Sequence, residues 1–333
     1  MRRSSSSIAL RQRLTATQPR TSLLPLLVAP RVAAATSIIK FNISTQHIRP
    51  GSTTVTSQHS ASTMSSNNTN PTFKVVNYEL LDELRRFWFE HIDDETRVIL
   101  PDMPAIKRFF VGGEDFDNAC TKKFSPALEE LKAQGINSSE AILTALPPRE
   151  PLDWLALLLL LDQIPRNCYR GDAAVQVFTY FDPLARGIAF KALELEIFTK
   201  SPVLRWNFGY RFWLALPLIH SESVAVHDRI GPEIFDPYEG DVESLLANSG
   251  DRDDGSEERK RAAAVVQERP DEAKFLLTSQ VDSEEKHVAI LRQFGRYPHR
   301  NGPLGREMTA EEQKYLDEGG DTFAPPKTDE EKA

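Results

Sequence analysis

The sequence predicts an all-α protein, a compact bundle of antiparallel helix pairs. Apolar residues recur at helical spacing in most segments that follow the N-terminal region. No stretch shows the sustained alternation of apolar and polar residues that marks a β-strand, and no glycine-rich loop of the nucleotide-binding kind occurs. About eight to ten helices suit this length, because helices in globular proteins average roughly three turns.

The N-terminal region differs in charge from the rest of the chain. Residues 1–70 contain eight Lys or Arg and no Asp or Glu, whereas the remainder has 32 basic and 48 acidic residues. Arginine spread among Ser, Thr, Ala and Leu without acids is typical of a mitochondrial transit peptide. We therefore expect a disordered segment that directs import into the mitochondrial matrix, with plain disorder as the alternative. Initiation at Met64 would instead yield a cytosolic form.

The acidic body excludes some classes of protein. A nucleic-acid-binding protein needs a broad basic footprint, which this body lacks. No apolar run approaches the roughly 20 residues that cross a bilayer, so we expect a soluble protein without a membrane span. The two cysteines, Cys120 and Cys168, form neither a metal-type pair nor a disulfide framework, which suits a reducing compartment.

The first helices are predicted from caps and breakers. Asn77 is a good N-cap for an apolar helical stretch, and residues 93–115 read as irregular because Pro and Gly interrupt them. Ser125-Pro126 reads as the N-cap and first residue of a helix that ends at Gly135. Ser138 begins a further short helix.

The central region contains the most apolar run of the chain, Trp154–Asp162, which predicts a buried helix because Leu and Ala dominate it. We expect the chain to turn at Pro165. The following helical pattern continues through Asp182-Pro183 with a bend, and residues 205–226 predict an aromatic helix kinked at Pro217.

The C-terminal region begins with residues 238–272, whose polar composition and lost periodicity predict a disordered insertion. Thr309 and Glu312 form a capping box that begins the last helix. We expect one helical domain over residues 71–322, followed by a disordered tail at 323–333.

Two loops combine Pro, Arg and Asn directly after apolar helices, at residues 162–171 and 294–306. With other segments they resemble the domain of unknown function 924 family. The matching motifs are Phe87-Trp88-Phe89, Phe116-Asp117, Leu161-Asp162-Gln163-x-Pro165-Arg166-Asn167-x-Tyr169-Arg170-Gly171, Leu216-Pro217-Leu218-x-His220-Ser221-Glu222, Phe294-Gly295-Arg296-x-Pro298-His299-Arg300-Asn301 and Leu304-Gly305-Arg306. The resemblance implies a fold similar to tetratricopeptide-repeat proteins and implies no activity. Ser223 departs from the pattern, because an acid commonly follows the His-Ser-Glu triplet.

The polar side chains of these motifs predict a pocket for a small anionic ligand, if the fold gathers them. Guanidinium groups suit carboxylates and phosphates, and histidine titrates near neutral pH. The candidate acid–base residues are His220, Glu222 and His299. The candidate ligand-binding residues are Asp162, Arg166, Asn167, Arg170, Arg296, Arg300, Asn301 and Arg306. The sequence leaves open whether the protein is an enzyme, and which ligand or cofactor it takes.

The alternative is a protein-interaction scaffold in which the same motifs are buried salt bridges and helix caps. Arg166 and Arg296 both follow apolar helices, where a cation stabilises the unpaired carbonyl groups of a C-terminus. We expect no metal site, because His220 and Glu222 lie about 200° apart around a helix.

Overall fold

The computed structural model describes residues 71–110 and 112–323, and every structural statement below concerns this part of the chain. The predictions for residues 1–70 and 324–333, including the transit segment, lie outside it. The described residues form helices and no strand, which confirms the all-α prediction. None of the described helices is long and apolar enough to cross a membrane. The packing is compatible with a tetratricopeptide-like arrangement.

The N-terminal helices are α2 (Tyr78–Trp88), α3 (Glu95–Ile99), α4 (Met103–Phe110), α5 (Gly113–Ala133) and α6 (Ser139–Ala145). The Asn77 side chain accepts the Leu80 N–H and so caps α2 as predicted. The prediction of irregular structure over residues 93–115 is wrong. Asp94 accepts a backbone N–H and begins α3, and α5 starts at Gly113 with Pro126 inside it.

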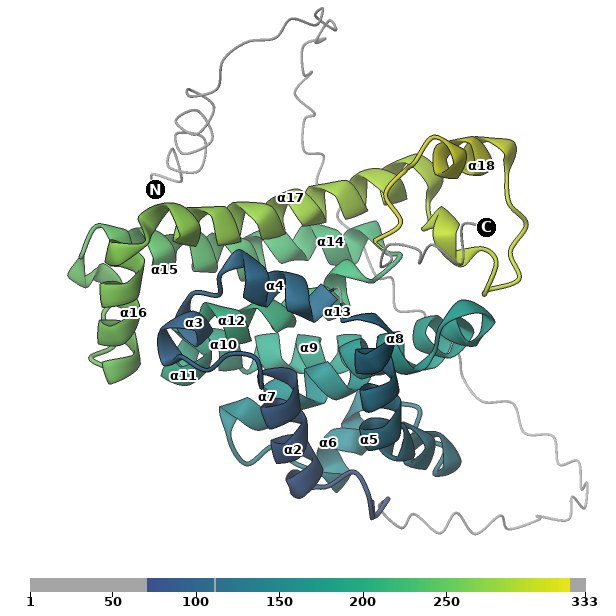
Figure 1. The fold of residues 1–333 in the computed structure, drawn as a ribbon, viewed down its shortest axis with the longest axis horizontal. Helices are drawn as coiled ribbons and strands as arrows, with labels where there is room; N and C mark the ends of the chain where they lie inside the picture. The colour runs from purple at the N-terminus through teal and green to yellow at the C-terminus, as the bar shows by residue number, and fades with distance from the viewer. Residues whose placement is uncertain (1–70, 111, 324–333) are drawn as a thin grey trace, which may run out of the picture. The chain divides into compact units, whose positions relative to one another are not determined.

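The central helices are α7 (Pro151–Leu158), α8 (Ile164–Cys168), α9 (Asp182–Glu194), α10 (Ile197–Lys200), α11 (Pro202–Arg205), α12 (Phe208–Arg211) and α13 (Leu216–Ile219). Residues 155–161 are almost fully buried, so the predicted central helix is confirmed. Figure 1 shows α7 and α9 in the middle of the described part. The segment 205–226 is several short helices rather than one kinked helix, because a 3₁₀ turn (Phe212–Leu214) and a break at 220–223 interrupt it.

Three π-helical turns each precede a proline that sits two residues further on. They are Leu159–Gln163, Val177–Phe181 and Gly231–Phe235. In the first turn, the Ile164 N–H bonds to the Leu159 carbonyl five residues back. Proline lacks an N–H and its ring clashes with the carbonyl four residues back, so the wider turn lets the helix pass the ring. The predicted turn at Pro165 is therefore wrong, and the chain stays helical to Cys168.

The C-terminal helices are α14 (Val224–Ile230), α15 (Asp236–Leu246), α16 (Glu257–Glu268), α17 (Pro270–Phe294) and α18 (Ala310–Asp317). The prediction of a disordered insertion at 238–272 is wrong, because α15 and α16 occupy most of it and a 3₁₀ turn (Gly250–Arg252) lies between them. The long helix α17 runs beside α14 and α15 (Figure 1). Both hydrogen bonds of the Thr309–Glu312 capping box are present, as predicted.

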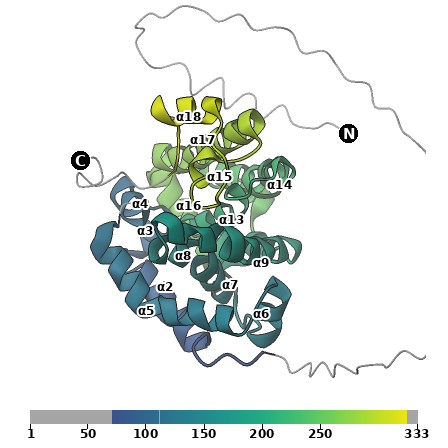
Figure 2. The ribbon, with the colours of Figure 1, turned by 90° about the vertical axis from the view of Figure 1, so that its right-hand side faces the viewer.

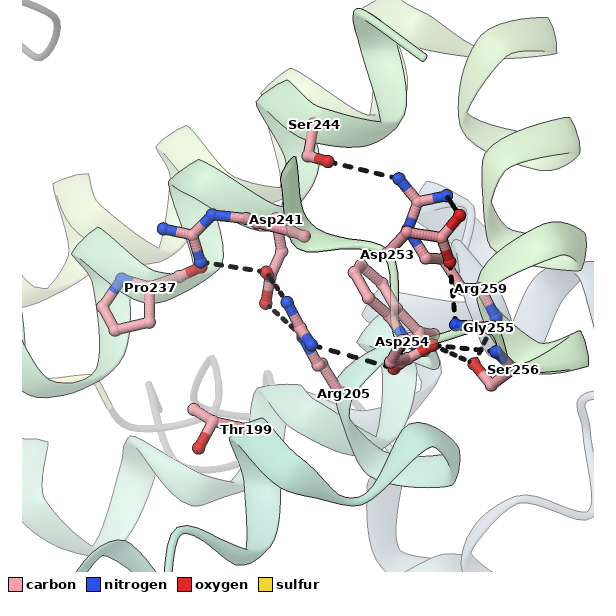
Figure 3. A network of polar contacts seen from close by, with 12 residues as sticks. Thr199, Arg205, Pro237, Asp241, Ser244, Asp253, Asp254, Gly255, Ser256 and Arg259 are labelled. Atoms are coloured by element: carbon pink, nitrogen blue, oxygen red, sulfur yellow. Dashed lines mark hydrogen bonds and ion pairs between the residues drawn. The ribbon is translucent and has the colours of Figure 1, made fainter. Parts of the chain in front are cut away.

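A buried charge network explains why residues 238–272 are ordered (Figure 3). Asp241 is 1% exposed and accepts hydrogen bonds from Arg205 (2.6 and 3.1 Å) and Arg211 (2.7 Å). The indole N–H of Trp206 donates to Asp254 at 2.6 Å. Asp241 and Asp254 are therefore partners of Arg205 and Trp206, about 40 positions away, although in sequence they read as solvated.

Two hydrophobic cores hold the described helices. The larger one is built on α2, α5, α7 and α9, and the smaller one joins Trp206 and Phe208 to α15, α16 and α17. Figure 2 shows α8 and α13 between α2 and α5 on one side and α17 and α18 on the other. Helices α8, α13 and α17 provide much of the wall of a cavity.

Candidate functional site

We call this space of about 590 Å³ the central cavity. Its lining carries three guanidinium groups and three imidazoles, from Arg166, Arg170, Arg300, His220, His287 and His299. Aromatic rings supply much of the remaining wall, from Phe109, Phe110, Phe178, Phe212, Tyr297 and Phe323. Among the described residues that line the cavity, none is Asp or Glu. The wall therefore combines guanidinium and imidazole groups with apolar aromatic surface.

Two buried carboxylates lie behind this wall. Asp162 is 0% exposed on the first π-helical turn, and Asp182 is 2% exposed at the start of α9. Arg166 donates to Asp182 at 2.6 Å and contacts Asp162 at 3.4 Å, and Arg300 lies 3.7 Å from Asp182. Asp162 belongs to the first π-helical turn, and Asp182 directly follows the second. Both carboxylates therefore contact the guanidinium of Arg166. Burial on this scale requires such pairing.

His220 and Asp162 form a pair at the edge of the cavity. His220 Nδ1 lies 2.8 Å from Asp162 Oδ1, and Gln163 donates to the other carboxylate oxygen at 2.5 Å. Burial raises the pKa of Asp162, but His220 and Arg166 outweigh it and hold that pKa below its usual value. Burial and Arg166 together lower the pKa of His220. At neutral pH the pair is an ionised carboxylate and an uncharged imidazole.

Arg300 is held between two aromatic rings. Its guanidinium carbon lies 4.5 Å from the Phe178 ring centre and 4.7 Å from that of Tyr297, and the residue is 6% exposed. Buried Nε atoms of Arg166 and Arg300 have no hydrogen-bond partner in the described structure, and the same holds for His299 Nδ1. Asp182 Oδ2 behind the wall has no hydrogen-bond partner either, and Arg97 and Arg259 carry unpaired Nε atoms away from the cavity, so unpaired atoms alone do not mark the binding site.

The other two imidazoles stay neutral over a wide pH range. Burial, assisted by the charge of Arg300, lowers the pKa of His299 to about 3. Burial likewise lowers the pKa of His287 to about 3, and its Nδ1 lies 2.7 Å from the Ser283 carbonyl oxygen. The Phe323 ring stacks on His287 with ring centres 3.4 Å apart, so the last described residue covers part of the cavity.

The structure divides the predicted site residues into two groups. Asp162 lies directly behind the cavity wall, whereas Arg166, Asn167, Arg170, His220, His299 and Arg300 line it. Asn167 donates to the Gln163 carbonyl at 2.9 Å, and Arg170 makes a bidentate pair with Asp117 at 2.9 Å, partly exposed. These two residues have structural partners as well as a place in the lining.

The remaining four residues, Glu222, Arg296, Asn301 and Arg306, are outside the lining. Arg306 donates twice to Glu222, at 2.7 and 3.1 Å, and the Tyr297 N–H donates to the same carboxylate. Arg296 and Asn301 both donate to Glu312, at 2.6 to 3.1 Å. These contacts hold the loop after α17 against α18 and against the segment after α13, which matches the structural alternative for these four residues.

Several cavity residues were not singled out from the sequence. Phe178 and Gln280 carry no loop motif, His287 and Tyr297 read as ordinary helical and loop residues, and Asp182 behind the wall was not singled out either. One sequence feature could have indicated the two buried acids: each is followed within three residues by a proline, Asp162 by Pro165 and Asp182 by Pro183. That signal becomes interpretable only when the π-helical turns are seen.

A second polar cluster lies away from the cavity. Ligand atoms of Asp82, Glu150 and Asp153 fall within 4.8 Å of one another, the spacing of a metal site. However, Arg85 donates to Glu150 at 2.8 Å and pairs with Asp82, and Arg149 donates to Asp153 at 3.1 Å. Two guanidiniums already balance these acids, so the cluster is an ion-pair network that is partly exposed and buried at Asp153.

Comparison with known proteins places the chain in a family. The family model described as "Bacterial protein of unknown function (DUF924)" matches residues 84–320. The chain belongs to this family. A solved structure of a protein of unknown function from Agrobacterium tumefaciens is 26% identical, with a TM-score of 0.45, and the match covers 72% of this chain and 98% of that one. No curated protein matches the chain.

Proposed function

We propose that the protein binds a small organic anion in the central cavity, with the carboxylate or phosphate group at Arg300 and Arg166. One observation carries the proposal: three Arg and three His line the cavity and no carboxylate does, among the described residues. Guanidinium groups are matched to carboxylate and phosphate oxygens through paired N–H donors.

The position of the buried acids favours an anion in the cavity. Asp162 and Asp182 balance Arg166 and Arg300 in formal charge, but they lie behind the guanidiniums and outside the lining. The cavity therefore faces the positive side of these ion pairs.

The remaining wall defines the body of the ligand. A volume of about 590 Å³ falls within the range of roughly 300–1,000 Å³ that is usual for small-molecule sites. Phenylalanine and tyrosine rings line much of it, so an apolar or aromatic body is expected. The scaffold alternative accounts for Glu222, Arg296, Asn301 and Arg306, but it does not explain a cavity that Arg and His line without a carboxylate among the described residues.

The test compares anions with matched neutral compounds. Melting temperatures of the wild-type protein are measured with a panel of aromatic and aliphatic carboxylates and phosphates, including 4-methoxybenzoate, and with the corresponding amides and alcohols. We expect stabilisation by anions alone. In Arg300→Met the affinity should fall by roughly 10- to 150-fold, the effect of losing hydrogen bonds to a charged group.

Arg306→Met is the matched control, because it removes the same group from a residue that pairs with Glu222 outside the cavity. It should lower stability without changing the response to anions. The proposal is wrong if no anion of the panel stabilises the wild type, or if Arg300→Met responds as the wild type does.

A further inference from the structure

Two imidazole–carboxylate pairs among the described residues differ at one nitrogen. His227 Nδ1 lies 2.6 Å from Glu284, and its Nε2 lies 2.8 Å from the Ser221 carbonyl oxygen, so both ring nitrogens are occupied. His220 has the same kind of partner at Nδ1, namely Asp162, but its ring lines the central cavity. Only the second pair presents its imidazole to a space that a ligand can enter.

The carboxylate sets the tautomer of His220. An ionised carboxylate only accepts hydrogen bonds, so Nδ1 of the neutral ring must carry the proton and Nε2 must carry the lone pair. Arg166 and Gln163 hold the same carboxylate, which keeps its oxygens in place. This arrangement is a base whose orientation is fixed before any substrate arrives.

Neither serine of the described cavity lining, Ser279 or Ser283, is hydrogen-bonded to His220. The same lining contains neither Cys nor Lys, and the Ser279 hydroxyl donates to a carbonyl of its own helix. The base therefore acts on a molecule that enters the cavity, and water is the general candidate.

We propose that His220 is the general base of a hydrolytic site, with Asp162 as its positioning residue and a small anionic carboxylic ester as substrate. The inference rests on the proposed function, since Arg300 and Arg166 are the groups that hold the anion.

The step balances without a further reactant. His220 Nε2 accepts a proton from water, the water oxygen bonds to the ester carbonyl carbon, and the π electron pair of the carbonyl moves to its oxygen. When the carbonyl re-forms, the bond to the leaving oxygen breaks and the proton on Nε2 passes to that oxygen. One ester and one water give one carboxylic acid and one alcohol.

The test uses the full chain and 4-acetoxybenzoate, whose hydrolysis to 4-hydroxybenzoate and acetate changes the ultraviolet absorbance. We expect the wild type to accelerate hydrolysis, and His220→Gln to lower kcat by about 100-fold or more with KM close to wild type. His227→Gln, the matched change in the closed pair, should keep kcat. Wild-type rates equal to the protein-free rate overturn the inference, and so does a folded His227→Gln protein that is as inactive as His220→Gln.

Two further readouts separate chemistry from structure. The rate of the wild type should rise with pH through one ionisation below the ordinary histidine pKa and stay level at neutral pH, because burial and Arg166 lower the pKa of His220. Asp162→Asn should lower kcat and move this ionisation to lower pH, since the balancing negative charge is lost. A wild-type rate that shows no such ionisation contradicts the role of His220 even if the variants fail to fold.

Binding of 4-methoxybenzoate, measured on the same samples, distinguishes the two proposals. Binding without turnover overturns only the catalytic role of His220. Absence of anion binding overturns the proposed function itself.

Discussion

Replacing Asp182 with Asn tests the charge arrangement most directly. The change keeps the shape of a side chain that is 2% exposed and removes the negative charge that lies 2.6 Å from Arg166 and 3.7 Å from Arg300. Breaking one partner of a buried ion pair costs about 3–5 kcal/mol. Arg166 retains Asp162 at 3.4 Å and is partly exposed, so we expect about 2–4 kcal/mol.

The loss is measured by urea unfolding, followed by the fluorescence of Trp213 and the other tryptophans, with unchanged slope as the sign of an unchanged two-state transition. Asp117→Asn is the control, because the Asp117–Arg170 pair is partly exposed and should contribute less than about 1 kcal/mol. A loss for Asp182→Asn that is no larger than this control would refute the buried ion pair as a source of stability.

The same variant should bind anions more tightly. Without the carboxylate of Asp182, less negative charge offsets the positive charges of Arg166 and Arg300. A carboxylate that binds in the cavity would then be attracted more strongly. Stabilisation by 4-methoxybenzoate should therefore be larger in Asp182→Asn than in the wild type. An equal or smaller stabilisation would indicate that the ligand does not contact these guanidiniums.

Two other predictions concern pH and the C-terminal loop. In the folded protein the pKa values of His287 and His299 are lowered to about 3, whereas in the unfolded chain they are near 6.5. As the pH falls below 6.5, the unfolded chain therefore takes up protons that the folded protein does not. The free energy of unfolding is full above pH 6.5 and should fall by about 3 kcal/mol at pH 5. Urea unfolding at both pH values checks this, and no change between them would contradict the shifts. Glu312→Ala removes the acceptor of Arg296, Asn301 and the capping box and should cost about 3 kcal/mol, yet leave the anion response of the melting temperature unchanged. A weakened anion response would place this loop in the binding site.

Features that depend on neighbours in the chain were predictable. Asn77 and the Thr309–Glu312 capping box satisfy backbone groups three residues away, so their identity alone indicates where a helix begins. The apolar run before Asp162 forms a buried helix because no other environment suits it. The same locality explains the clustering of Asp162, Arg166 and Asn167 on consecutive helical turns.

The predictions were wrong where local structure depends on residues that are far away in the sequence or on a helix type that the sequence does not reveal. Residues 238–272 read as disordered because their composition is polar and their apolar periodicity is lost, yet Asp241 pairs with Arg205 and Arg211 across the fold. Pro165 read as a turn because proline opposes a regular α-helix, whereas a π-helical turn admits it. Likewise, Arg300 and Arg306 are alike in sequence, and only their partners show that one lines the cavity and the other is bound to Glu222.

The sequence by itself determined the helical class, many helix ends and the family, because these follow from periodicity, caps and motif order. The tertiary structure decided which polar residues share a cavity, that Asp182 stands behind two arginines, and that His220 rather than His227 faces open space. Charges and hydrogen bonds act through space over a few ångströms. Two residues at such a short distance can be more than 50 positions apart along the chain, as His220 and Asp162 are.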